Sequence, residues 1–465
     1  MTKPLAELWQ LAGLPPYPPD AIALTGSDPV LPSSFAVGKA AQTSIGAAAL
    51  AAAEIFRRRT GRAQQVSVDA RHAAVEFRSE QYLRVDGAPL PERADPILGT
   101  YRCGDGRWVR LHTNFPHLRE GVLRLLKCAH ERTAVAGALQ TWEAEAFEMR
   151  AAEVGLAVTA MRSFAEWDAH PQGKAVATLP AVSIERIGDA PPVPLPIGGS
   201  RPLSGIRVLD LTRVIAGPVC GRALAAHGAE VLLITAEHLH SLPDLVIDTG
   251  RGKLSARLDL RAEEGRAALR KLAAQADVFV QSYRPGALAR QGFSPQEVAA
   301  LRPGMVFVTL SAYGHVGPWS ARRGFDSLVQ TASGFNHAEA EAAGIAGRPK
   351  PLPCQALDHA SGYLMAFGAM AALLRRAEEG GSWLVRVALA GTGRWLRGLG
   401  RVANGFDCAE PRQEAIAELL ETQPSGFGAL TAVRHAAQFS ETPARWERPS
   451  VPLGTHSPAW SVRPG

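Results

Sequence analysis

An aspartate stands at the start of a long apolar segment, in the stretch PLPCQALDHASGYLMAFG at residues 351–368. A helix that begins here has backbone N–H groups without intrahelical partners and the positive end of its dipole, and both favour a carboxylate at Asp358. The same donors could stabilise charge on a carbonyl that the carboxylate attacks, by about 3 kcal/mol per donor. Position alone leaves a second interpretation open, because Asp is also a favoured N-cap residue that stabilises a helix by about 1 kcal/mol.

A glycine-containing turn, VIAGP at residues 214–218, is a second feature with possible chemistry. It separates a short apolar run from a helical pattern, and backbone N–H groups at the start of such a helix suit a phosphate group. Most turns of this kind only join a strand to a helix, so its assignment depends on the elements around it.

Strand and helix patterns alternate through the C-terminal half of the chain. Short apolar runs rich in β-branched residues predict strands at 206–211, 230–235, 277–283 and 305–314, and helical patterns lie between them at 217–228, 262–276 and 294–304. This alternation predicts an α/β fold with a doubly wound parallel, Rossmann-like sheet and right-handed crossovers.

The proline-rich stretch DAPPVPLPIGGSRPLSG, at 189–205, divides the chain, because it can hold neither a helix nor a central strand. Residues 34–58 also echo residues 354–376 in layout, with Lys39 where Asp358 stands, although chance similarity of two Ala-rich helices remains an alternative. We therefore expect five parts: an N-terminal helical segment that is a degenerate repeat of 354–389 (1–65), a smaller α+β domain (66–188), a linker (189–204), a Rossmann-like domain (205–389) and a C-terminal extension forming part of a small domain (390–465).

Composition excludes several classes of function. The chain has 465 residues, a net charge of +6 and a pI near 9.2, but its basic residues are dispersed, so we expect no nucleic-acid partner and instead a polyanionic small ligand such as a nucleotide. The most apolar run, 40–53, is shorter than the ~20 residues that a membrane span needs, and the first residues lack a secretory pattern. Five scattered cysteines without a CxxC pair read as reduced thiols, which favours a cytoplasmic location and no metal site.

The region 203–389 resembles the class III CoA-transferase family, whose relatives include formyl-CoA transferase, carnitine CoA-transferase and α-methylacyl-CoA racemase. Five blocks stand in the family's order: LSGIRVLDLTRVIAGP (203–218), LAAHGAEVLLI (224–234), GRGKLSARLDL (250–260), ADVFVQSYRPGALARQGF (276–293) and VTLSAYGHVGPWS (308–320). Residues 66–200 resemble the family's later portion more weakly. The chain thus looks like a fused or truncated duplicate of the family plan, with one site per chain.

The resemblance implies a covalent mechanism and a set of site residues. Asp358 would be the nucleophile that carries the acyl group, with coenzyme A as a substrate, a carboxylic acid as acceptor and no prosthetic group or metal. The matched CoA-contacting or active-site positions are Val214, Ile215, Lys253, Tyr283, Arg284, Arg290 and Tyr313. The family also implies a homodimer and a second, smaller α+β domain beside the sheet domain.

Departures from the family pattern leave two alternatives open. The motif Asn is Ser282, the motif Glu is Thr235 and a common Gln is Arg222, which leaves room for an inactive CoA-binding member. An α-methylacyl-CoA racemase needs two acid/base groups, but its histidine position is Phe325 here, and His359 next to the aspartate is expected to point to another face of the helix.

Overall fold

The computed structural model describes residues 2–18, 20–91, 95–345 and 347–461. Its centre is a seven-stranded sheet in the order β11-β10-β9-β12-β13-β14-β8, in which all neighbours are parallel except β8, which pairs antiparallel with β14. The strands are β8 (Ser183–Gly188), β9 (Arg207–Leu211), β10 (Glu230–Thr235), β11 (Lys253–Arg257), β12 (Val278–Gln281), β13 (Val306–Ser311) and β14 (Ser382–Ala388). The predicted α/β class with a doubly wound parallel sheet is confirmed.

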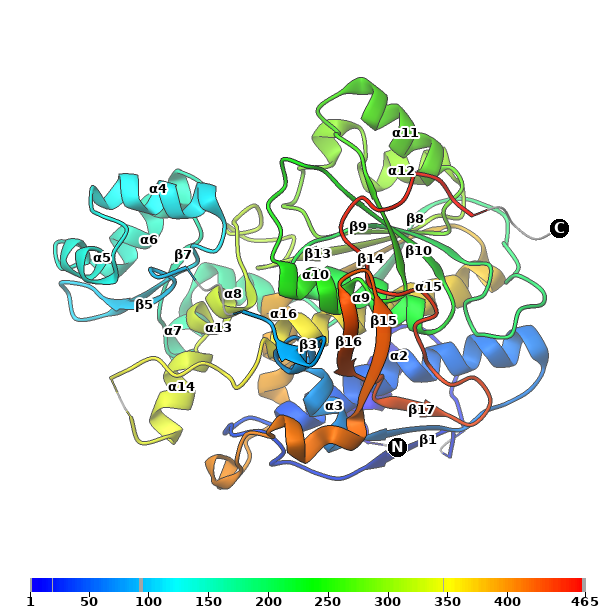
Figure 1. The fold of residues 1–465 in the computed structure, drawn as a ribbon, viewed down its shortest axis with the longest axis horizontal. Coiled ribbons are helices and arrows are strands. Elements are labelled where there is room, and N and C mark those ends of the chain that lie inside the picture. The colour runs from blue at the N-terminus through cyan, green and yellow to red at the C-terminus, as the bar shows by residue number, and fades with distance from the viewer. Residues whose placement is uncertain (1, 19, 92–94, 346, 462–465) are drawn as a thin grey trace.

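Alternating side chains explain why helices cover both faces of this sheet. Val208, Val278 and Val306 pack into the core of α9 (Ala216–Ala226) and α15 (Ala356–Glu379). The next residues along the same strands, Leu209, Phe279 and Phe307, pack into the core of α11 (Glu263–Ala273) and α12 (Pro295–Leu301) on the other side (Figure 1). Strands buried on both faces are mainly apolar, which is why the sequence allowed them to be predicted.

Two helices of 24 residues lie against each other below the sheet, α2 (Val37–Thr60) and α15 (Figure 1). The predicted buried helix over 40–53 is the central part of α2. Each helix lies between two parallel strands: α2 connects β1 (Ile22–Thr25) to β2 (Val66–Asp69), and α15 is the last of the three helices described between β13 and β14. The residues preceding the two helices also share one backbone conformation, φ −76° and ψ 62° at Ala36 and φ −77° and ψ 61° at Gln355.

A smaller unit with its own core stands to one side of the sheet (Figure 1, cyan). It holds the antiparallel sheet of β5 (Gly99–Arg102), β6 (Trp108–Leu111) and β7 (Val158–Ala160), with α4 (Pro116–Leu126), α5 (Arg132–Leu139) and α6 (Ala144–Glu153). Its core includes Leu328 of α13 (Asp326–Ala332), and Val214 and Phe325 pack against it. This unit is therefore attached to the ends of strands in the large sheet.

The C-terminal part adds strands to N-terminal ones. β17 (Ala437–Phe439) pairs with β2, and β15 (Leu420–Ser425) and β16 (Gly428–Val433) form a sheet with β3 (Arg84–Val85) and β4 (Ala88–Pro89). The other helices are α1 (Lys3–Leu11), α3 (Ala70–Glu76), α7 (Phe164–Ala169), α8 (Pro171–Ala177), α10 (Pro243–Thr249), α14 (Phe335–Ala342) and α16 (Leu389–Gly398).

Two local features differ from the expectations. The stretch 189–204 forms neither helix nor strand, but β8 before it belongs to the large sheet rather than to the smaller unit. The GRGKLSARLDL block, in which no strand was predicted, contains β11 at the edge of the sheet. Its polar residues Lys253 and Ser255 are buried, so the run differs from the mainly apolar inner strands.

Candidate active site

A cavity of about 360 Å³ opens at the carboxyl ends of the central strands, where the strand order reverses between β9 and β12. Ligands of open parallel sheets bind at such a point, because the loops that leave neighbouring strands diverge there. The smaller unit closes one side of the cavity with the residues that precede and open α4. The lining is Phe115, His117, Leu118, Arg213, Val214, Ile215, Ala216, Leu239, Ser282, Tyr283, Arg284, Pro285, Ala287, Leu310, Ser311, Ala312, Arg322, Arg323, Gly324, Phe325, Asp358 and Leu389.

Asp358 lies in this cavity as the third residue of α15, with only 7% of its surface exposed. It is not an N-cap, because the helix begins two residues earlier. The carboxylate of Asp326 binds the start of the helix instead, accepting the N–H of Asp358 at 2.8 Å and that of Leu357. These two N–H groups are therefore already occupied, and the expectation that they stabilise an oxyanion is wrong.

One glycine allows α15 to cross α9, and a second allows α9 to begin close to Thr212. A Cβ at Gly362 would come within 2.6 Å of the Ala216 carbonyl oxygen, so only glycine permits this crossing of α15 and α9. A Cβ at Gly217 would lie 2.4 Å from the Thr212 side chain. The crossing places Asp358, one helical turn before Gly362, next to the first turn of α9.

The turn itself is strained. Val214, which lines the cavity, has φ +75°, a conformation that a β-branched residue adopts only when its surroundings impose it. Such strain costs about 1–3 kcal/mol and is concentrated at functional sites. Ile215 follows as the residue preceding α9, so the predicted Val214 and Ile215 both lie at the cavity. Ala216 opens α9 and lines the cavity, and the N–H groups of Ala216 and Gly217 have no intrahelical partner, whereas Pro218 carries no N–H.

Asp358 and Asp326 form an acidic pair whose ionisation is coupled. Burial, the negative charge of Asp326 and that of Glu80 raise the pKa of Asp358 well above its ordinary value. Burial also raises the pKa of Asp326, to about 6, against the lowering effect of the N–H groups it accepts. A buried pair of carboxyl groups does not readily carry two negative charges, so ionisation of one carboxyl group opposes ionisation of the other.

His359 has no access to the cavity. Its side chain is fully buried, its Nε2 lies 3.1 Å from Oε2 of Glu80, and its ring stacks on Phe77 with the centroids 5.4 Å apart. Phe325, in contrast, lines the cavity and stacks on His112 with a centroid distance of 3.7 Å. A carbon ring at this position cannot move a proton, so the arrangement gives no support to a racemase with His359 as its second acid/base group.

The cavity wall is strongly basic. Arg284 was expected there, and it is joined by Arg213, Arg322 and Arg323, none of which was singled out from the sequence. Burial and the nearby charges of Arg323, Arg213 and Arg284 lower the pKa of His117, which leaves this imidazole neutral at physiological pH. A cavity with this balance favours a polyanionic ligand.

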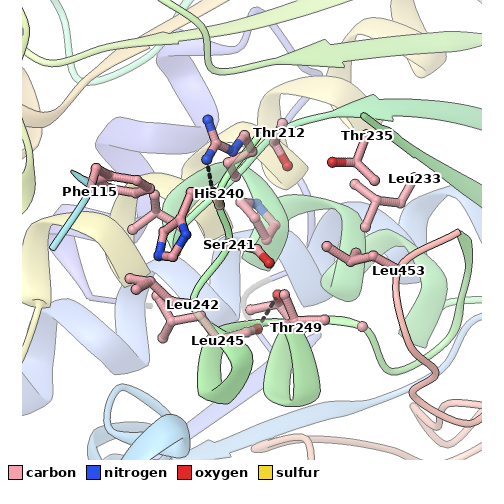
Figure 2. A pocket seen from close by; sticks show the side chains of 15 residues that line it. Phe115, Thr212, Leu233, Thr235, His240, Ser241, Leu242, Leu245, Thr249 and Leu453 are labelled. Atoms are coloured by element: carbon pink, nitrogen blue, oxygen red, sulfur yellow. Dashed lines mark hydrogen bonds between the residues drawn. The ribbon is translucent and has the colours of Figure 1, made fainter. Parts of the chain in front are cut away.

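A smaller apolar recess adjoins the cavity and shares Phe115, Arg213 and Val214 with it. Figure 2 shows the side chains of Thr235, Leu245 and Thr249 around this recess. The Arg213 guanidinium donates a hydrogen bond to the His240 carbonyl. The guanidinium also stands over the Phe115 ring at 5.3 Å, so Arg213 connects the smaller unit to the sheet.

Three predicted contact residues do not face the cavity. Lys253 is 1% exposed, and its ammonium donates to Oδ2 of Asp210 and to the Pro218 carbonyl, both at 2.8 Å, so a phosphate-facing role is wrong in this structure. Tyr313 is buried against Trp319, and burial raises its pKa to about 12. Arg290 lies exposed in a short 3₁₀ turn outside the lining.

The three departures from the family motifs have different places. Ser282 lines the cavity and accepts the N–H of Arg213 at 3.3 Å, while Thr235 lines the recess. Arg222 belongs to α9 and is fully buried, where it pairs with Asp248 at 2.6 Å and lies 3.9 Å from Glu76. Only the first of these substitutions touches the cavity that holds Asp358.

Comparison with known proteins agrees with this geometry. A family model, CoA-transferase family III, matches residues 21–193 and 203–399, which is most of the chain. The chain belongs to the CoA-transferase family III. Both matched parts contribute to the cavity, the first through the smaller unit and the second through the sheet and Asp358.

Named relatives of this family share only part of their length with the chain. Acetyl-coenzyme A transferase nodX of Hypoxylon pulicicidum is 37% identical, over 43% of this chain and 34% of that protein. The probable fatty acyl-CoA transferase Rv3272 of Mycobacterium tuberculosis is 31% identical, over 54% and 68% of the two chains. The alpha subunit of succinyl-CoA–L-malate CoA-transferase from Chloroflexus aurantiacus is 32% identical, over 40% and 46%. A crystal structure of Rv3272 aligns over 43% of this chain and 58% of that one, at 32% identity and a TM-score of 0.41.

Within the described ranges, none of the helices is both long and apolar enough to cross a lipid bilayer.

Proposed function

We propose that this chain transfers coenzyme A from an acyl-CoA to a free carboxylic acid, with Asp358 as the nucleophile. One observation carries the proposal: a buried carboxylate with a raised pKa faces a cavity at the carboxyl ends of a parallel sheet, and the cavity wall is rich in arginine. Perturbed carboxyl groups concentrate at catalytic sites, and arginines suit the phosphates of the CoA nucleotide.

The reaction proceeds by covalent exchange and needs no ATP. The Asp358 carboxylate attacks the thioester carbonyl, forms a mixed anhydride and releases CoA thiolate. The thiolate then attacks the Asp358 carbonyl carbon, which forms an aspartyl-CoA thioester and frees the first acid. The acceptor carboxylate repeats these two steps in reverse, so every bond broken is matched by one of the same kind.

Backbone donors for the oxyanion come from a different helix than expected. Because Asp326 occupies two N–H groups of α15, we assign the oxyanion to the N–H groups of Ala216 and Gly217, which open α9 just after the strained Val214 turn and have no intrahelical partner. Preorganised N–H groups of this kind stabilise a developing oxyanion without reorganisation.

A transfer assay tests this function. Isotope-labelled acyl-CoA donors are mixed with a panel of carboxylic acids and the protein, and new acyl-CoA species are followed by mass spectrometry. We expect a new thioester to appear in proportion to the lost donor, without net hydrolysis. Hydrolysis alone, or saturable CoA binding with no exchange for any pair, would contradict the proposal and favour an inactive CoA-binding protein.

The arginine wall predicts which part of the substrate it recognises. The double variant Arg284→Gln/Arg323→Gln should raise KM for acyl-CoA by about tenfold or more, since each charge-assisted hydrogen bond contributes about 1.5–3 kcal/mol. Steady-state kinetics with acyl-CoA and with an acyl-pantetheine, which lacks the nucleotide phosphates, check this. The variant should leave the acyl-pantetheine kinetics nearly unchanged.

Arg290→Gln is the matched control, because Arg290 is exposed and outside the cavity lining. We expect its KM for acyl-CoA to equal that of the unmodified protein within twofold. If Arg290→Gln raised KM for acyl-CoA more than the double variant does, the nucleotide would have to bind on the side of the loop that carries Arg290.

The acidic pair predicts how activity depends on pH. The reactive form of Asp358 is its carboxylate, and burial with the charge of Asp326 raises its pKa, so kcat/KM for acyl-CoA should rise with pH through a midpoint above the ordinary pKa of an aspartate. Asp326→Asn removes the neighbouring charge and should move this rise to lower pH. A pH profile of both proteins measures the shift, which loss of a purely structural contact would not produce. Identical midpoints would contradict the coupling.

We further propose a cytoplasmic homodimer that binds neither nucleic acid nor membranes. The reduced state of the scattered cysteines and the dispersed charge support the location, and the family resemblance supports the dimer. A monomeric mass by light scattering would contradict the dimer without affecting the reaction, because the smaller unit that closes the cavity belongs to the same chain.

A further inference from the structure

A second cavity, of about 730 Å³, lies at the start of α2, the helix that mirrors α15. It shares no lining residue with the cavity that holds Asp358. Its wall combines basic and aromatic side chains from α2, α7, α14 and α16, namely Lys39, Phe164, Trp167, Phe335, Arg394 and Trp395.

Lys39 occupies the place in α2 that Asp358 occupies in α15. Each is the third residue of its 24-residue helix, and each helix begins from the same backbone conformation. An aspartate also binds the start of each helix in the same way. Asp28 accepts the N–H groups of Gly38 and Lys39 at 2.9 Å, as Asp326 accepts that of Asp358.

The two aspartates that accept the N–H groups of the helix starts stand in matching tripeptides, GSD at 26–28 and GFD at 324–326. The similarity therefore covers the loop, the helix start and the strands between which each helix lies. The first copy retains the geometry that holds a side chain at the helix start, but it presents an ammonium where the second copy presents a carboxylate. A cation in this position cannot attack a thioester as a carboxylate does, but it can bind an anion.

The charge balance of the second cavity favours an anion. Its two acidic residues are already paired, Glu7 with Lys3 at 3.8 Å and Asp168 with Arg397 at 2.8 Å. Lys39 and Arg394 form no ion pair or side-chain hydrogen bond with the described residues. The ammonium of Lys39 interacts with Asp28 through space, but that carboxylate already accepts two N–H groups.

A further donor and an apolar surface complete the cavity. The indole Nε1 of Trp395 is buried and has no acceptor among the described residues, which is costly unless a ligand supplies one. Phe164 and Phe335 stack edge to face with their centroids 5.3 Å apart and form an aromatic part of the wall. Cationic and N–H donors beside aromatic rings match an acid that carries an apolar body.

We infer that this second cavity binds an organic monocarboxylate with an apolar or aromatic body. The carboxylate contacts Lys39, Arg394 and the Trp395 indole, and the body lies against Phe164, Trp167 and Phe335. The binding is reversible and involves no covalent step. The inference does not depend on the activity of Asp358, because the two cavities are separate.

Fluorine NMR with 4-fluorophenylacetate tests the inference on the full chain, with saturating CoA present to occupy the active site. We expect saturable line broadening that Lys39→Ala weakens at least about tenfold. Arg394→Ala, at an exposed position that should not affect folding, is expected to weaken it in the same direction. Asp358→Asn should leave the affinity unchanged, so failure of the proposed function would not resemble failure of this inference.

Two controls make the result specific. Lys174→Ala removes the same charge from an exposed position of α8, a helix that lines the cavity through other residues, and should bind the probe as the unmodified protein does. The uncharged 4-fluorobenzyl alcohol should bind at least about tenfold more weakly than the acid. Equal affinity for Lys39→Ala, equal affinity for the alcohol, or no saturation with the acid would each overturn the inference.

Discussion

Asp358→Asn is expected to lower the rate of CoA transfer by at least about 10⁴-fold, because an amide can form neither the anhydride nor the thioester. The loss should appear in kcat, with KM for acyl-CoA changed little, since the arginine wall that binds the nucleotide is untouched. Steady-state kinetics with the best donor and acceptor pair measure this. Residual transfer within about tenfold of the unmodified protein would exclude Asp358 as the nucleophile.

Stability distinguishes this loss from misfolding. The pKa of Asp358 in the folded protein is raised above its unfolded value, so the contribution of the neutral carboxyl group is present at low pH and is lost as pH rises through the raised pKa. The amide of Asp358→Asn does not ionise, so this variant keeps its stability as pH rises. It should unfold at the same or a higher temperature than the unmodified protein at neutral pH. A catalytically inactive variant that is also less stable would point to a structural role.

Lys253→Met should destabilise the protein by about 3–5 kcal/mol, because it leaves a buried, unpaired carboxylate at Asp210. The ammonium of Lys253 connects β11 to β9 and to the Pro218 carbonyl in the first turn of α9, directly after the strained turn. Chemical denaturation followed by circular dichroism measures the change. Asp210→Asn/Lys253→Met, which removes both charges, should recover part of the loss.

The control for this prediction is Lys271→Met, because Lys271 is an exposed residue of α11. This substitution is expected to change the free energy of unfolding by no more than about 0.5 kcal/mol. If Lys253 instead contacted the phosphates of CoA, Lys253→Met would raise KM for acyl-CoA at nearly unchanged stability. That outcome would restore the role implied by the family motif and contradict the buried ion pair.

The sequence was sufficient for the sheet because its strands are buried on both faces. β10 agrees with the predicted run over 230–235, and β9, β12 and β13 lie within theirs. The edge strand β11 was missed because its run carries two polar residues, Lys253 and Ser255, which are buried in the fold. Lys253 was assigned to a CoA contact because it matches a family motif. Burial of a lysine depends on a partner, Asp210, that is distant in the sequence.

The site was only partly predictable. Five of the predicted residues line the cavity, because family motifs follow the carboxyl ends of strands: Asp358, Val214, Ile215, Tyr283 and Arg284. Five other lining residues were not predicted: Phe115, His117, Arg213, Arg322 and Arg323. Residues in loops carry no periodic signal, and the residues of the smaller unit lie more than 90 positions away in the chain. The same reason explains why Asp326 was not recognised as the partner of Asp358.

Trapping the covalent intermediate tests the central claim most directly. The protein is mixed with an acyl-CoA and then hydroxylamine, and its peptides are analysed by mass spectrometry. We predict a hydroxamate on Asp358 that requires acyl-CoA and is absent from Asp358→Asn. Transfer of CoA with no modified residue, or with the hydroxamate on another carboxylate, would contradict the account.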